Sequence, residues 1–425
     1  MRKKLFEEQS AWVICLKFKG KTALRNPEVV LEEMKSLARA LPAIKLKGAS
    51  FETVGKINPG TLFGSGKIDE IRKKILLIDI KLILIDGALT PVQQRNLEKA
   101  WSLKVLDKTA LIIEIFSDRA KSREGVLQVE LAALTYQRTR LVRAWTHLER
   151  QRGGLGFVGG PGETQIESDR RAIDSAIVKI KKNLEKIVKT RRLHRSSKER
   201  KSRKIISLVG YTNSGKSTIF NHLTGANVFA KDMLFATLDP TVRSFETPDH
   251  IQTLLSDTVG FISDLPTELI AAFSATLEEV LSSDLILHVR DISHKETYKQ
   301  FTNVNETLET IGIPKDKNII EVWNKADLLS SSEKLRLLNV LKRRKNIFLV
   351  SGVKGEGFEK LVNGISKTLN NGKTTEWLRI SLDSWDKRLW LYKNVNVLEE
   401  AFDHDELSLK VDWTSNHKEK YLKRF

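Results

Sequence analysis

One segment of the sequence has the residue types and spacing of a phosphate-binding loop. The stretch GYTNSGKS, residues 210–217, follows an apolar run at 205–209 that predicts a strand, and it leads into a predicted helix. Backbone N–H groups of residues 213–218 can surround phosphate oxygens at the helix N-terminus. Lys216 can reach the outer phosphates, and the Ser217 hydroxyl can hold Mg²⁺. The segment therefore predicts a nucleotide site that uses magnesium.

Two later segments supply residues that would respond to the terminal phosphate. LLSDTVGF carries Asp257, which can hold Mg²⁺ directly or through water, and Gly260, whose amide can contact the γ-phosphate. FATLDPTVR carries Thr237, which can give Mg²⁺ a second hydroxyl when its loop closes over a triphosphate. A hydroxyl that caps an ordinary turn is the alternative for Thr237.

A fourth segment predicts that the base is guanine. NKAD, residues 324–327, follows the strand-like run NIIEVW. The Asp327 carboxylate can accept hydrogen bonds from guanine N1 and N2, whereas adenine would leave it unpaired at a cost of a few kcal/mol. Ser351, Gly352 and Val353 follow another predicted strand, where the backbone can meet the base, although such turns are common after strands. The expected nucleotide is GTP, not ATP.

Two long helical patterns precede the phosphate loop. Apolar residues recur at alternating spacings of four and three over 127–148 and over 166–187, and each pattern includes one arginine, Arg138 or Arg170. These patterns predict an antiparallel hairpin of two helices, each about 45 Å long at 1.5 Å per residue. The glycine-rich segment GGLGFVGGPG, residues 153–162, would form its tip.

The tip segment matches G-x-G-x-x-G, but helices flank it on both sides, so the sequence disfavours a dinucleotide fold there. Bare backbone at a tip can approach another surface closely, and basic residues along both arms suit packed RNA. A solvated coiled-coil spacer is the alternative. The basic residues of the arms are Arg138, Arg140, Arg143, Arg170, Arg171, Lys181 and Lys182. A second glycine segment, GTLFGSGKIDE, fails the phosphate-loop spacing and has Ile68 where Ser or Thr is needed.

Composition sets the broader limits. The formal net charge is +19, which attracts polyanions and above all nucleic acid. Hydrophobic residues make up 40% of the chain, and no apolar run is long enough to cross a bilayer. The N-terminus is too charged for a signal peptide, so we expect a soluble protein of the cytoplasm. The single cysteine, Cys15, has no disulfide partner and is expected to be a buried strand residue.

On these motifs the sequence resembles the HflX family of ribosome-associated GTPases. The resemblance extends from about the N-terminus to the 360s and includes PVQQRNLEKAW, VLDKTALIIEIFSDRAKSREGVLQVELA, GGPGETQIESDRR, GYTNSGKST, FATLDPT, DTVGF and NKAD. With it, the expected architecture is α/β and multidomain. An N-terminal α/β subdomain (1–119) would precede the basic helical hairpin (120–204) and a GTPase domain with a doubly wound sheet (205–370). The tail (371–425) carries no recognised motif and is expected to be a small α+β domain.

The resemblance implies a GTPase that binds the large ribosomal subunit and splits or rescues stalled or idle ribosomes, particularly under stress. The hairpin loop would contact rRNA near the peptidyl transferase centre through Arg150, Arg152, Gly153, Gly154, Gly156, Gly159 and Gly160. A GTP-regulated RNA-binding or ribosome-assembly factor without splitting activity is the alternative. A membrane-anchored signalling GTPase is disfavoured because the C-terminus YLKRF has no prenylation motif and Met1-Arg2 precludes myristoylation. We expect a monomer.

Residue by residue, the resemblance places Mg²⁺ on Ser217 and Thr237. Lys216 and Gly260 would contact the γ-phosphate. Gly352 and Val353 replace a commoner Ser-Ala pair, which leaves the affinity of the base-contacting loop open. The expected nucleotide contacts are Gly210, Tyr211, Thr212, Asn213, Ser214, Gly215, Lys216, Ser217, Phe235, Ala236, Thr237, Leu238, Asp239, Asp257, Thr258, Val259, Gly260, Asn324, Lys325, Ala326, Asp327, Ser351, Gly352 and Val353.

Two positions bear on the rate of hydrolysis. Phe261 follows the Asp-x-x-Gly turn, where small GTPases usually have a glutamine that orients water. A phenyl ring cannot do this, so we expect slow hydrolysis that ribosomes stimulate; alternatively, Phe261 simply packs in the core. Asn213 can hold K⁺ near the bridge between the β- and γ-phosphates, or it can hydrogen-bond within its own loop.

Overall fold

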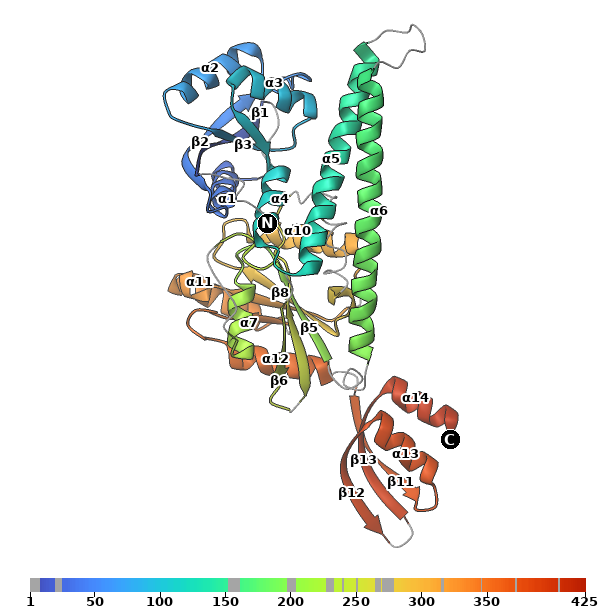
Figure 1. Ribbon diagram of the computed structural model, residues 1–425. Coiled ribbons are helices and arrows are strands. Elements are labelled where there is room, and N and C mark those ends of the chain that lie inside the picture. Colours follow the sequence, from blue (N-terminus) through green and yellow to red (C-terminus); the bar gives the residue numbers. More distant parts are fainter. Residues whose placement is uncertain are drawn as a thin grey trace. The chain divides into compact units, whose positions relative to one another are not determined.

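The computed structural model describes residues 8–19, 25–151, 161–196, 204–226, 233–238, 241–249, 251–263, 269, 279–314, 317–344, 346–370, 373–403 and 406–425. The chain divides into two compact units, Met1–Leu361 and Val362–Phe425. As predicted, it is an α/β chain of several parts that contains a P-loop domain (Figure 1).

The N-terminal part of the first unit is a four-stranded parallel sheet in the order β2-β1-β3-β4. Its strands are β1 (Gln9–Phe18), β2 (Ile44–Val54), β3 (Leu82–Asp86) and β4 (Lys104–Asp107). Apolar side chains point to both faces, so helices cover both: α1 (Pro27–Arg39) and α4 (Lys108–Arg119) on one, α2 (Ser65–Leu76) and α3 (Pro91–Trp101) on the other. Cys15 is buried on β1, as the sequence predicted.

Local signals explain where several of these helices begin. Asn26 caps α1, and Thr90 with Gln93 forms a capping box at the start of α3. The second glycine segment of the sequence leads into α2, which begins at Ser65 directly after Gly64. That segment therefore starts a helix on the N-terminal sheet.

Two long helices follow, α5 (Arg123–Gln151) and α6 (Pro161–Ser196), and they lie side by side (Figure 1). The two arginines of the apolar patterns share one partner, because Arg138 Nε lies 2.7 Å from Asp174 Oδ1 and Arg170 Nε lies 3.8 Å from Asp174 Oδ2. The expected tip lies outside the described residues, which excludes Arg152, Gly153, Gly154, Gly156, Gly159 and Gly160 from structural description, together with the side chain of Arg150.

The part of the first unit that carries the phosphate loop has a six-stranded sheet in the order β10-β9-β8-β5-β7-β6, and only the β6–β7 pair is antiparallel. Its strands are β5 (Lys204–Gly210), β6 (Thr241–Glu246), β7 (Gln252–Asp257), β8 (Leu285–Asp291), β9 (Ile319–Asn324) and β10 (Ile347–Leu349). The described helices are α7 (Lys216–Thr224), α10 (Thr297–Ile311), α11 (Ser331–Leu341) and α12 (Phe358–Asn370), with a short 3₁₀ helix η2 (Ala326–Leu328).

The second unit contains an antiparallel sheet in the order β11-β13-β12 with two helices. Its elements are β11 (Lys373–Ser381), α13 (Trp385–Asn394), β12 (Asn396–Asp403), β13 (Glu406–Thr414) and α14 (Ser415–Arg424). Trp413 and Leu391 belong to its own small core. In the part of the chain that the structure describes, no helix has the length and apolar character needed to span a bilayer.

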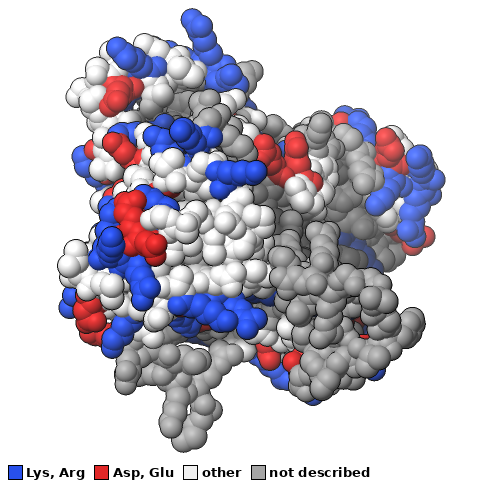
Figure 2. Space-filling model, turned by 90° about the horizontal axis from the view of Figure 1, so that it is seen from above, with Lys and Arg blue, Asp and Glu red and all other residues white. Residues whose placement is uncertain are grey.

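On the face seen in Figure 2, Lys and Arg form separate groups with Asp and Glu between them. On the hairpin, Arg170 and Arg171 are 51% and 78% exposed. Arg140 does not add to the exposed surface as expected, because its guanidinium lies 3.4 Å from the buried Asp107 carboxylate and its side chain is 18% exposed.

Candidate nucleotide-binding site

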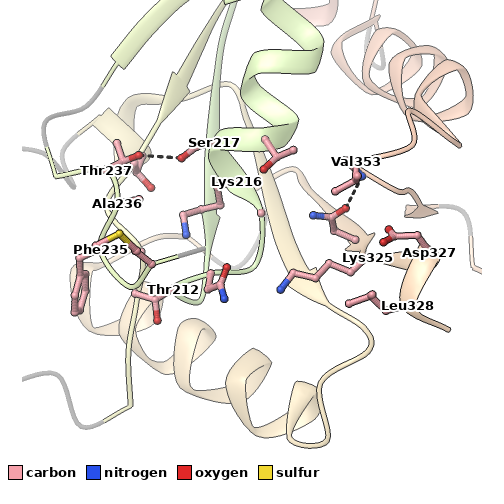
Figure 3. A pocket seen from close by; sticks show the side chains of 18 residues that line it. Thr212, Lys216, Ser217, Phe235, Ala236, Thr237, Lys325, Asp327, Leu328 and Val353 are labelled. Atoms are coloured by element: carbon pink, nitrogen blue, oxygen red, sulfur yellow. Dashed lines mark hydrogen bonds between the residues drawn. The ribbon is translucent and has the colours of Figure 1, made fainter. Parts of the chain in front are cut away.

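A cavity of about 370 Å³ lies where the phosphate loop, the Thr237 segment and the loop after β9 meet. The phosphate loop follows the carboxyl end of β5 and the third segment follows that of β9, at the edge where open α/β sheets bind ligands. Figure 3 shows Ser217 and Thr237 on one side, Asp327 and Val353 on the other, and Lys216 between them. The volume is within the range of small-molecule sites.

The phosphate loop needs glycine at two positions. Gly210 ends β5 at φ +154°, and a Cβ there would lie 2.2 Å from the Val289 carbonyl oxygen. Gly215 precedes α7 at φ +91°, and a Cβ there would lie 2.1 Å from Asn324 Nδ2. These close approaches exclude side chains and bring the base-side Asn324 against the loop.

Three oxygen-bearing side chains converge at the start of α7. Ser217 Oγ donates to Asp257 Oδ2 at 2.7 Å and lies 2.9 Å from Thr237 Oγ1, which donates to the same carboxylate oxygen at 3.1 Å. Asp257 Oδ1 is buried with no hydrogen-bond partner among the described residues. Hydroxyl and carboxylate oxygens are the ligands that Mg²⁺ prefers, so this set fits the ion.

Burial changes the pKa values of Lys216 and Asp257 in opposite directions. It lowers the pKa of the Lys216 ammonium to about 8, although Asp257 opposes the shift. Burial also raises the pKa of Asp257, against the attraction of Lys216 and the hydrogen bonds from Ser217 and Thr237. Lys216 Nζ donates to the carbonyls of Gly210 and Tyr211 at 3.1 and 2.9 Å. A phosphate would supply this buried cation with an anionic partner in direct contact.

Gly260 lies directly against the phosphate loop. A Cβ at Gly260 would lie 2.9 Å from Thr212 Cα and 3.0 Å from Lys216 Nζ. The next residue is joined to the loop by two backbone hydrogen bonds, from Thr212 N to Phe261 O at 2.6 Å and from Phe261 N to Gly210 O at 3.1 Å. Gly260 is therefore held close to the tip of Lys216.

Side chains from two loops form the base side of the cavity. Asn324 Nδ2 donates to Ser214 O at 2.9 Å, and Gly352 N donates to Asn324 Oδ1 at 3.0 Å. The Ser351 hydroxyl donates to the Asp327 carboxylate, which lines the cavity. Lys325 takes φ +65° and pairs with Asp291 at 2.6 Å. Asn324 thus links the phosphate loop to the loop after β10, and Ser351 orients the Asp327 carboxylate.

Comparisons with known proteins agree with this geometry. Residues 28–117, 119–198 and 205–325 match family models described in turn as GTP-binding GTPase N-terminal, GTP-binding GTPase Middle Region and 50S ribosome-binding GTPase. The chain is 46% identical over 389 residues to GTPase HflX of Magnetococcus marinus, which covers 90% of this chain and 88% of that protein. The chain belongs to the HflX GTPase family.

Two further HflX proteins are similar over most of their length. GTPase HflX of Escherichia coli is 41% identical over 362 residues, with 84% of each chain covered. GTPase HflX of Lacrimispora saccharolytica is 40% identical over 375 residues, with 88% of this chain and 87% of that one covered. The predicted family and the predicted GTPase activity are both confirmed by these matches.

In this HflX chain, most of the residues expected to contact nucleotide line the cavity. They are Thr212, Asn213, Gly215, Lys216, Ser217, Phe235, Ala236, Thr237, Thr258, Gly260, Asn324, Lys325, Asp327, Gly352 and Val353. Others lie outside the lining: Gly210, Tyr211, Ser214, Leu238, Asp257, Val259, Ala326 and Ser351. Asp239 lies outside the described residues.

The cavity also has lining residues that were absent from the expected contact set. The backbone N–H of Thr218 was expected near the phosphates, although the contact set did not include this residue, and Leu328 directly follows the expected contact Asp327. Met233 lies two residues before Phe235, and no spacing in the sequence pointed to it. Phe261 is 4% exposed in the core and is not among the lining residues, which is the alternative that the sequence left open.

Proposed function

We propose that this HflX-family GTPase binds the large ribosomal subunit and splits or rescues stalled or idle ribosomes. The observation that carries the proposal is the family match over most of the chain, including residues 205–325 to the model described as 50S ribosome-binding GTPase. The protein would act as a monomer in the cytoplasm. The four regions 1–119, 120–204, 205–370 and 371–425 are proposed as its functional parts.

The hairpin is the proposed contact to rRNA near the peptidyl transferase centre. Its expected contacts are the glycines of 153–160 with Arg150 and Arg152. The exposed face of α6 supports this role, since Arg170, Arg171, Lys181 and Lys182 all lie on the solvent side. Neutralised phosphates would release counterions, so binding should weaken steeply as salt rises.

The nucleotide site supplies the proposed switch. Ser217 and Thr237 would hold Mg²⁺ with help from Asp257, and the ion would neutralise charge on the outer phosphates. Lys216 and the Gly260 amide would contact the γ-phosphate, while Asp327 would accept hydrogen bonds from guanine. Loss of the γ-phosphate would release the Thr237 and Gly260 loops and change the affinity for the ribosome.

Hydrolysis by the isolated protein is proposed to be slow. Phe261 is buried in the core, so nothing at that position orients water. Asn213, which lines the cavity at φ +60°, is a proposed K⁺ site. Turnover at equal ionic strength should then be severalfold faster in K⁺ than in Na⁺, and replacing Asn213 by alanine should remove the difference. Equal wild-type rates in the two salts would contradict the K⁺ site.

Sedimentation of intact ribosomes with the protein tests the main proposal. With a non-hydrolysable GTP analogue, the protein should migrate with large subunits and free small subunits should accumulate; with GDP, both effects should be weaker. Replacing Gly154, Gly156 and Gly159 by alanine should reduce binding, because added Cβ atoms would interfere at a close contact.

The chain offers a matched control for the glycine variant. Gly55, Gly64 and Gly66 lie in open space, where an added Cβ meets no atom within 4 Å. Their triple alanine variant should bind and split ribosomes like wild type. Binding without release of subunits would favour an RNA-binding or assembly factor. Full binding by the tip variant would contradict the proposed contact.

A further inference from the structure

The side chain of Tyr211 leaves the phosphate loop and reaches helix α1 of the N-terminal part. Tyr211 follows Gly210, is 5% exposed and does not line the cavity. Its hydroxyl donates to Glu33 Oε2 on α1 at 2.6 Å. It also accepts from the Ser263 backbone N–H at 2.8 Å and lies 2.8 Å from the Ser263 hydroxyl. One phenol oxygen thus joins two segments far apart in sequence.

Glu33 is fixed by two cations, the buried Lys108 and the partly buried Arg25. Its carboxylate pairs with Arg25 at 2.7 Å and with Lys108 at 2.9 Å, and the side chains of Glu33 and Lys108 are each 7% exposed. Arg25 also reaches Glu296 of the GTPase part at 3.4 Å. Because the carboxylate has these partners, it stays ionised and is a strong acceptor for Tyr211. The acceptor is therefore held in place by the N-terminal part.

The other partner of Tyr211 belongs to the loop that carries Gly260. Ser263 lies three residues after Gly260, and Asn303 of α10 donates to its hydroxyl at 2.8 Å. Phe261, between Gly260 and Ser263, is bonded to the phosphate loop through its backbone. The segment is held at Phe261 by backbone hydrogen bonds and at Ser263 by contacts with the Tyr211 hydroxyl.

We propose that Tyr211 is a positioning residue for GTP hydrolysis. Its hydroxyl ties the Gly260 loop to Glu33, so the N-terminal part helps to keep Gly260 beside Lys216, where the γ-phosphate would lie. A displacement of the order of 1 Å at a reacting group can cost up to about a hundredfold in rate. The proposal depends on GTP hydrolysis at this site and is independent of ribosome binding.

Replacing Tyr211 by phenylalanine tests the role of the hydroxyl alone. We expect kcat for GTP to fall about tenfold, because the Gly260 loop spends less time in position. The affinity for GDP, which has no γ-phosphate, should stay within about twofold of wild type. The matched control is Tyr298→Phe, since this tyrosine of α10 is 72% exposed and its loss should leave kcat unchanged.

A double-mutant cycle tests the partner. Glu33→Gln alone should lower kcat by less than Tyr211→Phe, because the amide oxygen can still accept the phenol proton. In the Tyr211→Phe background, Glu33→Gln should add almost no further loss. Additive effects, or a wild-type kcat in folded Tyr211→Phe, would overturn the proposal. A purely structural role would lower the melting temperature and leave kcat per folded molecule unchanged.

A replacement variant and the wild-type activity help to interpret these experiments. If Tyr211→Phe does not fold, Ser263→Ala replaces it, because that change removes the contacts of the Ser263 hydroxyl with Tyr211 and Asn303 and leaves the pair of Tyr211 with Glu33 intact. Its kcat should then fall with little change in GDP affinity. Failure of the wild type to hydrolyse GTP would contradict the activity of the site itself. If the wild type and the folded variants hydrolysed GTP at the same rate, the result would contradict only the role of Tyr211.

Discussion

The ring of Phe116 on α4 packs edge to face against Phe235 beside the nucleotide cavity, with 4.7 Å between ring centroids and 79° between planes. Phe235 takes φ +55°, a strained value for a bulky residue, and lies two residues before Thr237. Both rings are at most 2% exposed. A helix of the N-terminal part therefore supports the loop that carries a proposed magnesium ligand.

Replacing Phe116 by alanine should lower the affinity for a GTP analogue about tenfold while GDP binding changes less. The Thr237 loop would lose its support, and only a triphosphate requires that loop to close. The free energy of unfolding should fall by about 3 kcal/mol from the cavity. Titrations with both nucleotides measure the ratio of affinities.

Phe63→Ala is the control for this loss of stability. Phe63 is 1% exposed, but its ring contacts Trp101 on the other face of the N-terminal sheet. Phe63→Ala should lower the free energy of unfolding by a similar amount without changing the ratio of the affinities for the GTP analogue and GDP. An equal change of that ratio in both variants would show that general destabilisation, rather than loop support, is responsible.

The hydroxyls of Ser217 and Thr237 should have separable effects on nucleotide binding. Ser217→Ala should weaken both GTP and GDP at least tenfold in Mg²⁺ and change little in EDTA, because it removes a metal ligand. Thr237→Ala should weaken only the triphosphate. Thr302→Ala, which removes an exposed hydroxyl of α10, serves as the control. If Ser217→Ala weakened nucleotide binding equally in Mg²⁺ and in EDTA, the result would argue against metal ligation by Ser217.

Asp327 should determine the choice of base. Asp327→Asn should reduce GTP hydrolysis at low substrate by about two orders of magnitude, since the amide cannot accept from both N1 and N2 of guanine. Xanthosine triphosphate should become a better substrate, because its 2-oxo group accepts from the new amide. Competition assays with GTP, XTP and ATP measure this preference. If Asp327→Asn kept the wild-type preference for GTP, Asp327 would not be the residue that contacts the base.

Glu33 should make stability depend on acid pH. Burial alone would raise the pKa of its carboxyl, but Lys108 and Arg25 outweigh burial and lower the pKa from 4.5 to about 2. A lowered folded-state pKa adds stability above the unfolded value, and this stability is lost as the pH falls from about 4.5 towards 2. The full contribution is about 3 kcal/mol, of which about 1.4 kcal/mol should be gone at pH 3.5.

Urea unfolding of wild type and Glu33→Gln at pH 7 and pH 3.5 measures this effect. The difference between their free energies of unfolding should shrink at the lower pH. Glu28→Gln is the control, because that side chain is 79% exposed and its pair with Lys295 is 3.7 Å long. A difference that stays constant between the two pH values would contradict the role of Glu33 charge.

The sequence by itself determined the nucleotide chemistry and the two long helices. Phosphate-loop and base motifs are local, so the spacing of Gly215, Lys216 and Ser217 fixes their geometry once a strand and a helix flank them. The apolar spacing likewise marks α5 and α6. Such patterns state which residues share one loop or one helical face, and that information is contained in a short stretch of chain.

Only the tertiary structure decided which distant segments meet. The Tyr211 side chain reaches Glu33, which no motif indicated, and Arg140 was expected to face solvent but lies against Asp107. Phe261 could have faced water or core, and packing placed it in the core. These partners are separated by tens of residues or more along the chain. Their contacts depend on how whole elements pack, which no local spacing records.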